Sequence, residues 1–442
     1  MILLQYDAVI IGGGPGGYSC AIRLAQKGKK VAVVEKDKVG GECLNYGCIP
    51  SKAFIELADS IHYLMDMNVL HSVPQVDMKG WQDWKWKMIG KLTGGVRTLL
   101  KAYGATLIEG TGEIVDANHV RVSDTVYECE NIVIATGSSP ITLPGFDSVI
   151  YNREFLDLDK IPEKIAIIGG GYIGVELGTA MRKMGSDVTI IEMMDSILPG
   201  IDRDLSSVVH KRLLSLGIKV MLSKKVLGVS GSPRAVIMLE GGEKIEAEKV
   251  LMTVGRKPNT TGFSLDKIHV QMDGRFIKVD KHMRTSVPNV YAIGDVAGQP
   301  MLAHKAYYDA DVAADNICGE DRESDYRAMP IVVYSDPEIA YTGKKGEKET
   351  FFPVAANGRA LGMNSSAGAY RLYYNEGGTI TGGGIVSPHA SELISEISLA
   401  VESGLSLMDI GMTIHPHPTL SEGVHESAEG GYRKQLHYKS VG

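Results

Sequence analysis

Apolar runs, a glycine turn and a helical pattern follow one another at the start of the chain. Residues 7–11 form an apolar run that leads into a turn containing Gly12, Gly14 and Gly17. Apolar residues then recur at helical intervals as far as residue 25, and a second apolar run over 31–34 ends at Glu35. This pattern predicts a strand, a helix and a second strand, with the glycines in the first connection.

The same unit recurs in the middle of the chain. An apolar run over 165–168 leads into Gly169, Gly171 and Gly174, and a second run over 188–191 ends at Glu192. In both copies the acid stands eighteen positions after the third glycine. Such glycines let backbone N–H groups and a helix N-terminus approach a diphosphate, and the acid accepts hydrogen bonds from a ribose. Two copies predict two dinucleotides. For either copy alone, the alternative is a glycine-rich turn without a ligand.

The second acid also predicts which nicotinamide dinucleotide binds. A carboxylate at the position of Glu192 accepts a hydrogen bond from a free ribose 2′-hydroxyl and repels a 2′-phosphate. No cluster of arginines stands near it to bind such a phosphate. We therefore expect NAD(H) rather than its phosphorylated form.

The remaining pattern predicts further helices, strands and a separate final domain. Asp295 follows a short apolar strand, where it either contacts a ligand or caps the next helix. Pro140, Pro144 and Gly145 mark a domain edge. Helical spacing covers 53–103, 302–317, 390–403 and 405–412, and strand patterns cover 132–134, 250–254, 291–293, 331–334, 371–374 and 379–386. Strands followed by helices from about residue 326 indicate an α+β domain.

Length and composition exclude several classes of protein. A chain of 442 residues with 44% hydrophobic and 22% charged residues is typical of a globular protein of two to four domains. The net charge of -7 and the lack of a basic block argue against a nucleic-acid partner. No apolar run is long enough to predict a membrane span, and the N-terminus leads straight into a strand without a leader. With one close cysteine pair among five cysteines, we expect a reducing, cytoplasmic setting.

That close pair is Cys43 and Cys48. In an ideal helix this spacing separates the Cα atoms by about 8–9 Å, beyond the roughly 7 Å limit for a disulfide. A bridge therefore needs a distorted turn, which Gly47 can supply. So short a loop gains little stability from cross-linking, which favours a redox role. Two unrelated buried thiols are the alternative. A second alternative is that the two cysteines bind a metal ion. No second cysteine pair exists to complete such a site, so we expect no metal.

A histidine pair near the C-terminus provides a candidate acid/base. The segment 414–422 contains His415, His417 and Glu422, so that His417 precedes the glutamate by five residues. An imidazole whose second nitrogen is held by a carboxylate is a common catalytic arrangement. An inert surface histidine is the alternative.

Taken together, these segments resemble the flavin-dependent pyridine nucleotide–disulfide oxidoreductases. The resemblance covers nearly the whole chain, and the stretch GGECLNYGCIPSK at 40–52 is its most specific part. Within the family, the chain is most similar to the members that oxidise dihydrolipoyl groups. The resemblance implies two Rossmann-like dinucleotide-binding domains, for FAD and NAD, and a C-terminal α+β interface domain in a homodimer. The expected limits are 1–148 and 276–326 for FAD, 149–275 for NAD and 327–442 for the interface.

The resemblance also implies roles for catalytic residues. Cys48 is expected to lie against the flavin as a thiolate, and Cys43 to exchange with the substrate disulfide. His417 is expected to come from the partner subunit as acid/base, oriented by Glu422. His415 is not expected to be the base, because it lies seven residues from Glu422. Lys52 and Glu176 are expected near the flavin and the nicotinamide.

Nucleotide contacts are implied for both cofactors. For FAD the positions are Gly12, Gly14, Gly17, Glu35, Lys52, Gly112, Thr136, Gly137, Ser138, Asp295, Met301, Leu302, Ala303 and His304. For NAD they are Gly169, Gly171, Tyr172, Gly174, Glu176, Glu192, Val226 and Gly255. The expected substrate is a lipoyl-bearing protein or free lipoamide.

Some features depart from the family pattern, and other functions stay open. Tyr46 replaces the commoner valine between the cysteines, and Pro416 replaces the usual alanine between the histidines. A reductase of another disulfide or of mercuric ion is one alternative, although the C-terminus at 439–442 lacks the cysteine pair of mercuric reductases. A non-catalytic, nucleotide-sensing flavoprotein is the alternative from a different class.

Overall fold

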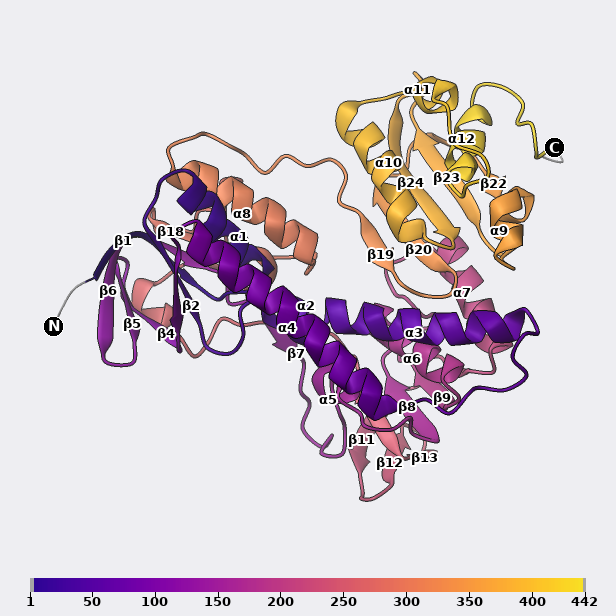
Figure 1. The fold of residues 1–442 in the computed structure, drawn as a ribbon, viewed down its shortest axis with the longest axis horizontal. Coiled ribbons are helices and arrows are strands. Elements are labelled where there is room, and N and C mark those ends of the chain that lie inside the picture. Colours follow the sequence, from indigo (N-terminus) through magenta and orange to yellow (C-terminus); the bar gives the residue numbers. More distant parts are fainter. Residues whose placement is uncertain (1–3, 440–442) are drawn as a thin grey trace.

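The structure is a computed structural model that describes residues 4–439. The ends of the first and last predicted domains, residues 1–3 and 440–442, lie outside the described residues, and so does most of the C-terminal tail at 439–442. The described residues contain three larger sheets, of seven, four and six strands, and three smaller ones of three, two and two strands. The last sheet and its helices form the orange and yellow part at the upper right of Figure 1. The domain limits given above stay a prediction.

The first sheet is built around β1, which contains the predicted apolar run 7–11. Its strand order is β3-β2-β1-β6-β5-β4, and β18 pairs in parallel with β6. Side chains alternate along β1: Ala8 and Ile10 pack in one core beneath helices, and Val9 and Ile11 pack in another core on the opposite face. The strands are β1 (Leu4–Ile11), β2 (Val31–Glu35), β3 (Thr106–Glu109), β4 (Gly112–Asp116), β5 (His119–Val122), β6 (Thr125–Ile134) and β18 (Val290–Ala292).

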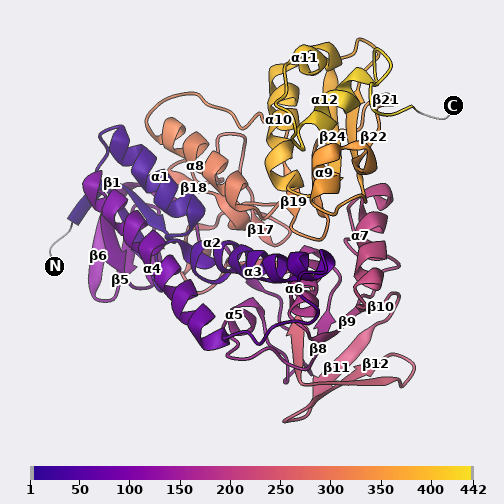
Figure 2. The same ribbon diagram turned by 45° about the vertical axis from the view of Figure 1, so that its right-hand side comes forward.

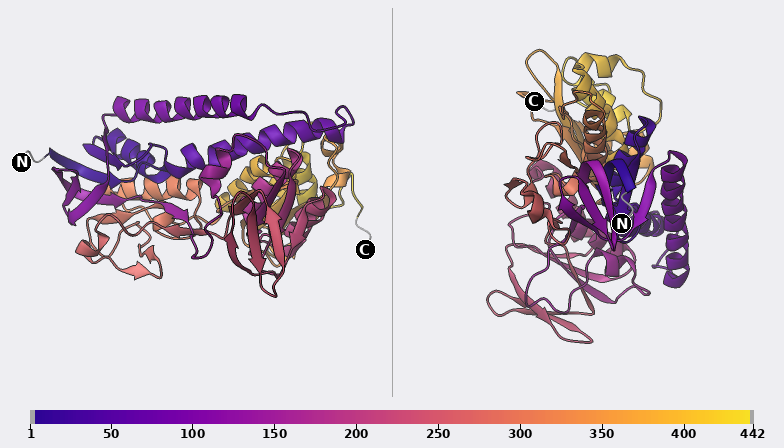
Figure 3. Two further views of the ribbon diagram at one scale, coloured as in Figure 1. Left: turned by 90° about the horizontal axis from the view of Figure 1, so that it is seen from below. Right: turned by 90° about the vertical axis from the view of Figure 1, so that its left-hand side faces the viewer.

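Helices from distant parts of the chain cover this sheet. Helix α1 (Pro15–Gln26) packs against α8 (Ala303–Ile317), although almost 300 residues separate them in the sequence. The region 53–103, predicted to be helical, contains α3 (Cys48–Asp66) and α4 (Met78–Ala102), but residues 67–77 between them are not helical, so the prediction was wrong there. The short α2 (Gly41–Tyr46) precedes them. Figure 3 shows α4 as an outer helix alongside the others.

The second sheet repeats the parallel arrangement in the order β10-β9-β8-β14. Its parallel strands are β8 (Lys164–Ile168), β9 (Asp187–Ile191), β10 (Lys219–Met221) and β14 (Lys249–Met252), with helices α5 (Asn152–Leu156), α6 (Tyr172–Lys183) and α7 (Arg203–Ser215). An antiparallel sheet of β11 (Val226–Ser230), β12 (Ala235–Leu239) and β13 (Lys244–Ala247) lies beside it. Two small ladders pair β7 (Ser138–Pro140) with β15 (Arg256–Pro258), and β16 (Met272–Asp273) with β17 (Phe276–Ile277).

The last sheet is antiparallel, in the order β19-β20-β24-β23-β21, and β22 pairs with β23. Its strands are β19 (Ile331–Val333), β20 (Glu338–Gly343), β21 (Lys348–Glu349), β22 (Phe352–Pro353), β23 (Ala369–Tyr374) and β24 (Ile380–Ser387). The helices are α9 (Gly358–Gly362), α10 (Ala390–Ser403), α11 (Leu407–Met412) and α12 (Glu422–Glu429), and short 3-10 turns occur at Leu265–Ile268, Gly294–Val296 and Val354–Ala356. One apolar core joins α3, the second sheet and residues of the last sheet such as Ile339. Figure 2 shows α3 and α6, which contact each other, below the last sheet.

Candidate functional site

The first glycine turn connects β1 to α1 and has no room for a side chain at Gly12 or Gly17. Gly12 has a φ of +107°, and a Cβ atom on Gly17 would lie 1.8 Å from the Gly12 carbonyl oxygen. Glu35, at the end of β2, accepts hydrogen bonds from the backbone N–H groups of Gly13 and Asp37, both at 2.8 Å. The start of α1 therefore lies beside the Glu35 carboxylate and lines a cavity. The N-terminus of a helix in this position suits a diphosphate.

The second glycine turn has the same geometry. Gly169 has a φ of +108°, and a Cβ atom on Gly174 would lie 2.1 Å from the Gly169 carbonyl oxygen. Glu192 accepts hydrogen bonds from the N–H groups of Gly170 at 2.6 Å and Met194 at 2.7 Å. The sequence repeat is thus a structural repeat, and each unit fits a dinucleotide.

A cavity of about 520 Å³ extends from the first glycine turn to the two cysteines. Its lining includes Gly12, Gly14, Glu35, Cys43, Cys48, Lys52, Gly112, Thr136, Gly137, Ser138, Tyr172, Glu176, Asp295, Met301 and Ala303. The other expected site residues do not line it: Gly17, Leu302, His304, Gly169, Gly171, Gly174, Glu192, Val226, Gly255, His417 and Glu422. His304, for example, bonds through Nε2 to the carbonyl oxygen of Pro330, 2.8 Å away.

The cysteine pair spans a break between two helices. Helix α2 ends at Tyr46, and α3 begins at Cys48 after Gly47, whose Cβ position is only 3.1 Å from the carbonyl oxygen of Glu42. Both cysteines are free thiols that face the cavity, and they lie close enough for the Cys43 S–H to donate a hydrogen bond to the Cys48 sulfur. The interruption at Gly47 that the spacing predicted is therefore present.

The two thiols have opposite pKa shifts. The hydrogen bond from Cys43 lowers the pKa of Cys48; burial opposes this effect, and the Lys52 ammonium adds to it. The same hydrogen bond, followed by burial, raises the pKa of Cys43 well above its usual range. Of the two thiols, Cys48 therefore loses its proton more readily, and Cys43 is the one that keeps it.

Lys52 and the buried Glu176 form an ion pair beside the cysteines. Lys52 Nζ lies 2.8 Å from Glu176 Oε2, and the other carboxylate oxygen accepts a hydrogen bond from the Tyr334 N–H at 2.9 Å. The Lys52 ammonium also lies 4.4 Å from the centre of the Tyr334 ring. Burial alone would lower the pKa of Lys52, but the charge and hydrogen bond of Glu176 outweigh it, and the pKa is raised. Lys52 therefore keeps its charge.

Asp295 also lines the cavity. It accepts a hydrogen bond from the Ser138 hydroxyl at 2.5 Å, and that hydroxyl in turn accepts one from Arg256 Nε at 2.8 Å. Helix α8 begins nearby at Ala303, so its positive end is directed towards the same space. Asp295 thus does not act as the side-chain cap of α8, which has none.

His417 and Glu422 form the predicted pair, but they lie outside the cavity. His417 Nδ1 is 2.9 Å from Glu422 Oε1, and the Thr419 N–H donates to the other oxygen at 2.8 Å. Burial alone would raise the pKa of Glu422, but these two donors outweigh it and the pKa is lowered. The His417 side chain is 81% exposed. His415 instead bonds to Glu396 at 2.9 Å, which raises its pKa, and it is nearly buried.

Sequence reasoning missed several polar residues that line the cavity, namely Glu42, Asn152, Arg153, Arg256 and Asn259. Asn152 and Arg153 contact Glu42 across 110 and 111 residues of sequence. Nothing local in the sequence indicates these contacts, because the partners lie so far apart along the chain. Within residues 4–439, no group of three or more potential ligands is arranged for a metal ion, and no helix is long and apolar enough to cross a membrane.

Comparisons with known proteins agree over the whole chain. The family model described as pyridine nucleotide-disulphide oxidoreductase matches residues 6–310, and the dimerisation domain of the same family matches residues 329–428. Dihydrolipoyl dehydrogenases from Bacillus subtilis and Haloferax volcanii are 44% and 43% identical, covering 98% of this chain and 98% and 97% of theirs. The structure of LpdA from Mycobacterium tuberculosis has a TM-score of 0.90 at 26% identity, over 97% of this chain and 99% of that one. The HOCl-induced flavoprotein disulfide reductase RclA from Escherichia coli has a TM-score of 0.87 at 26% identity, over 96% of this chain and 99% of that one.

Proposed function

Because the chain belongs to the pyridine nucleotide-disulphide oxidoreductase family, we propose that it oxidises a dihydrolipoyl group with NAD⁺ through a Cys43–Cys48 disulfide. It is a flavoprotein disulfide oxidoreductase, and its cofactors are FAD and NAD(H). The dimerisation domain supports assembly as a homodimer. The proposed substrate is a lipoyl-bearing protein or free lipoamide, and the proposed location is the cytoplasm.

The cavity supports the assignment of FAD to the first unit. Gly12, Gly14 and Gly17 leave space for a diphosphate at the start of α1, where any Cβ on Gly17 would collide with backbone. Glu35 would exchange its contact with Gly13 for the ribose hydroxyls. Lys52, Gly112, Thr136, Gly137, Ser138, Asp295, Met301, Leu302, Ala303 and His304 complete the proposed FAD site. When bound, FAD carries two electrons between the cysteine pair and NAD⁺.

The second unit is assigned to NAD(H). Gly169, Gly171 and Gly174 repeat the phosphate-binding turn, and Glu192 stands where a ribose would lie. Tyr172 and Glu176, at the start of α6, line the cavity from this side, so the two dinucleotides would meet there. Val226 and Gly255 are the remaining proposed NAD contacts.

The two cysteines have distinct proposed roles in thiol–disulfide exchange. A substrate thiolate attacks the Cys43 sulfur, the Cys43–Cys48 bond breaks, and Cys48 leaves as the thiolate that its lowered pKa favours. The second substrate thiol then attacks the mixed disulfide, so that the lipoyl disulfide closes and Cys43 departs with a proton. The substrate has lost two electrons, and the cysteine pair has gained them.

The proton of the substrate thiol needs an acceptor near Cys43. The partner subunit's His417 is the proposed acceptor, because the imidazole is exposed and its Nδ1 is held by Glu422, which leaves Nε2 free for a proton. Glu422 orients the ring and stabilises its charged form.

The observation that carries this proposal is the cysteine pair that faces the cavity with Lys52 beside Cys48. The test is anaerobic titration of the holoenzyme with dithionite, followed by visible absorption. We expect a long-wavelength band after two electrons, from a thiolate against the flavin, and its loss in Cys48→Ala. Direct bleaching without that band would overturn the redox role of the pair.

A second variant separates the two halves of the reaction. Cys43→Ser is expected to abolish lipoamide turnover and to keep oxidation of NADH by an artificial acceptor, which bypasses the cysteines. Lipoamide turnover that survives in Cys43→Ser would contradict the assignment.

A further inference from the structure

The helix that carries Cys43 is too short to hold its own position. Helix α2 has six residues, Gly41–Tyr46, and no side chain caps its N-terminus. Helices of this length are not stable by themselves in water. Its geometry must therefore be imposed by contacts with other parts of the chain.

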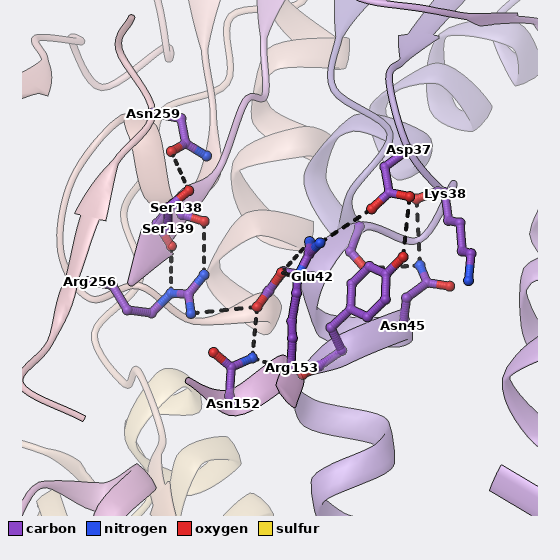
Figure 4. A network of polar contacts seen from close by, with 12 residues as sticks. Asp37, Lys38, Glu42, Asn45, Ser138, Ser139, Asn152, Arg153, Arg256 and Asn259 are labelled. Atoms are coloured by element: carbon purple, nitrogen blue, oxygen red, sulfur yellow. Dashed lines mark hydrogen bonds and ion pairs between the residues drawn. The ribbon is translucent and has the colours of Figure 1, made fainter. Parts of the chain in front are cut away.

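Contacts from α5 hold the N-terminal end of α2. Glu42, the residue before Cys43, accepts a hydrogen bond from Asn152 Nδ2 at 2.8 Å. Its other carboxylate oxygen accepts two from Arg153, from Nε at 3.0 Å and from a terminal nitrogen at 2.8 Å. Figure 4 shows Glu42 between Asn152, Arg153 and Arg256.

The C-terminal end of α2 is held by the same two residues. Asn152 Nδ2 also donates to the Tyr46 carbonyl oxygen at 2.8 Å. The Arg153 guanidinium lies 3.8 Å from the centre of the Tyr46 ring, and the Tyr46 hydroxyl donates to Asp37 at 3.2 Å. Two consecutive residues thus contact both ends of the helix whose middle carries Cys43.

The contacts continue from α2 to other residues that line the cavity. A terminal nitrogen of Arg256 lies 3.8 Å from Glu42, and Arg256 also donates to Ser138, which bonds to Asp295. Exposed single ion pairs contribute little. Here, however, one carboxylate is shared by a two-bond arginine contact, an amide and a second arginine, and such geometry fixes position as well as charge.

We propose that Asn152 and Arg153 are positioning residues that hold α2 through Glu42 and Tyr46, and so keep the Cys43 sulfur aligned with Cys48. This inference rests on the proposed exchange at Cys43. Arg153 acts on the reaction only through the placement of the helix, since its guanidinium is engaged by Glu42, Tyr46 and Asp37.

The test compares Arg153→Met, Arg153→Lys and Glu42→Gln in the holoenzyme. Lysine keeps the charge but cannot make the two-bond contact or stack as a plane. The readouts are the rate of the long-wavelength band after mixing with dihydrolipoamide, the rate of NADH oxidation by an artificial acceptor, and the melting temperature. Arg97→Met is the matched control, because Arg97, on the outer helix α4, forms an exposed ion pair with Glu109 of β3.

We expect Arg153→Met to slow reduction by dihydrolipoamide by about tenfold to a hundredfold, more than it slows the artificial-acceptor rate, because small misplacements of a reacting atom have effects of this size. The rate of reduction in Arg153→Lys should lie between the rates in Arg153→Met and in wild type. Adding Glu42→Gln to Arg153→Met should slow the rate little further, because both changes remove the same contact between Arg153 and Glu42. Arg97→Met should match wild type.

The outcomes separate the two proposals. If wild type shows no long-wavelength band, the proposed function itself fails. If wild type shows the band and all Arg153 variants form it at the wild-type rate, the positioning role is wrong. Equal losses in both rates, or a loss that only follows a fall in melting temperature, would also overturn it in favour of a general structural role.

Discussion

Lys52 on α3 and Glu176 on α6 form an ion pair with 2.8 Å between Nζ and Oε2, at the place where the two glycine-turn units meet. The glutamate is almost fully buried, and its second oxygen is held by the backbone of Tyr334 in the last domain. The pair therefore keeps one positive charge next to Cys48 in a poorly hydrated site. Three parts of the chain contribute to that charge placement.

Removal of this charge should raise the pKa of Cys48. The Lys52 ammonium stabilises the thiolate and so lowers the pKa of Cys48, and Lys52→Met removes that stabilisation. The long-wavelength band of the two-electron-reduced enzyme should then appear only at higher pH than in wild type. Absorption during an anaerobic pH titration measures the midpoint. Lys91→Met, at an exposed position of α4, is the control, and an unshifted midpoint in Lys52→Met would contradict the prediction.

The two neighbouring histidines should behave differently. His417→Ala removes the proposed proton acceptor and is expected to slow dihydrolipoamide oxidation by about a hundredfold or more. His415→Ala should have little effect on this rate, because His415 bonds to Glu396 and not to Glu422. Stopped-flow reduction by dihydrolipoamide measures both. Similar losses in the two variants would show that the assignment of the base is wrong.

Position 17 in the first glycine turn should tolerate no side chain. In Gly17→Ala the new Cβ would meet the Gly12 carbonyl oxygen at 1.8 Å, so the turn must open and FAD should be lost during purification. The flavin-to-protein absorbance ratio measures this loss. Gly90→Ala on α4 is the matched control, because nothing lies within 4 Å of its Cβ position. That change should retain FAD and stabilise the fold by about 0.5–1 kcal/mol.

An ion-pair cluster away from the cysteines should determine stability in acid. Buried Lys183 lies 2.7 Å from Asp59 and 2.8 Å from Asp336, which also pairs with Arg212. Burial alone would raise the pKa of Asp336, but Lys183 and Arg212 outweigh it and the pKa falls below the usual 3.8. Stability from this group is therefore complete above the unfolded pKa and is lost as the pH falls through the lower folded pKa.

Lys183→Met is expected to cost about 3 kcal/mol at neutral pH, because it leaves two carboxylates without their shared partner. The difference from wild type should shrink as the pH falls below about 3.8 and the carboxylates take up protons. Denaturant unfolding at several pH values measures it. A difference that grows in acid would contradict the assigned sign.

The sequence predicted those features that have a local signal. Each strand, glycine turn and acid of the two units lies within about thirty residues, and β1, α1 and β2 follow the apolar pattern closely. The interruption at Gly47 was predictable because five-residue spacing in a continuous helix keeps the thiols apart. His417 and Glu422 were also predictable, because only five positions separate them.

Contacts across long stretches of sequence left no such signal. Nothing near Asn152 or Arg153 in the sequence indicates that both contact α2, more than 100 residues earlier. Tyr334 contributes only its backbone N–H to Glu176, which almost any residue could supply. His304 follows the family pattern at the start of α8, yet its ring is directed to Pro330 and not into the cavity. Local sequence determines the elements, whereas the packing of the elements determines which side chains meet.

The exposed position of His417 in the last domain, away from the cavity that holds Cys43, has a consequence for genetics. Under the proposed arrangement, one active centre combines cysteines of one chain with a histidine of the other. Two defective alleles, Cys43→Ser and His417→Ala, would then complement each other, because a mixed dimer regains one intact centre. With random pairing, about a quarter of the centres would work. Two alleles that both alter the cysteines would never complement, so crosses between mutants would sort them by domain.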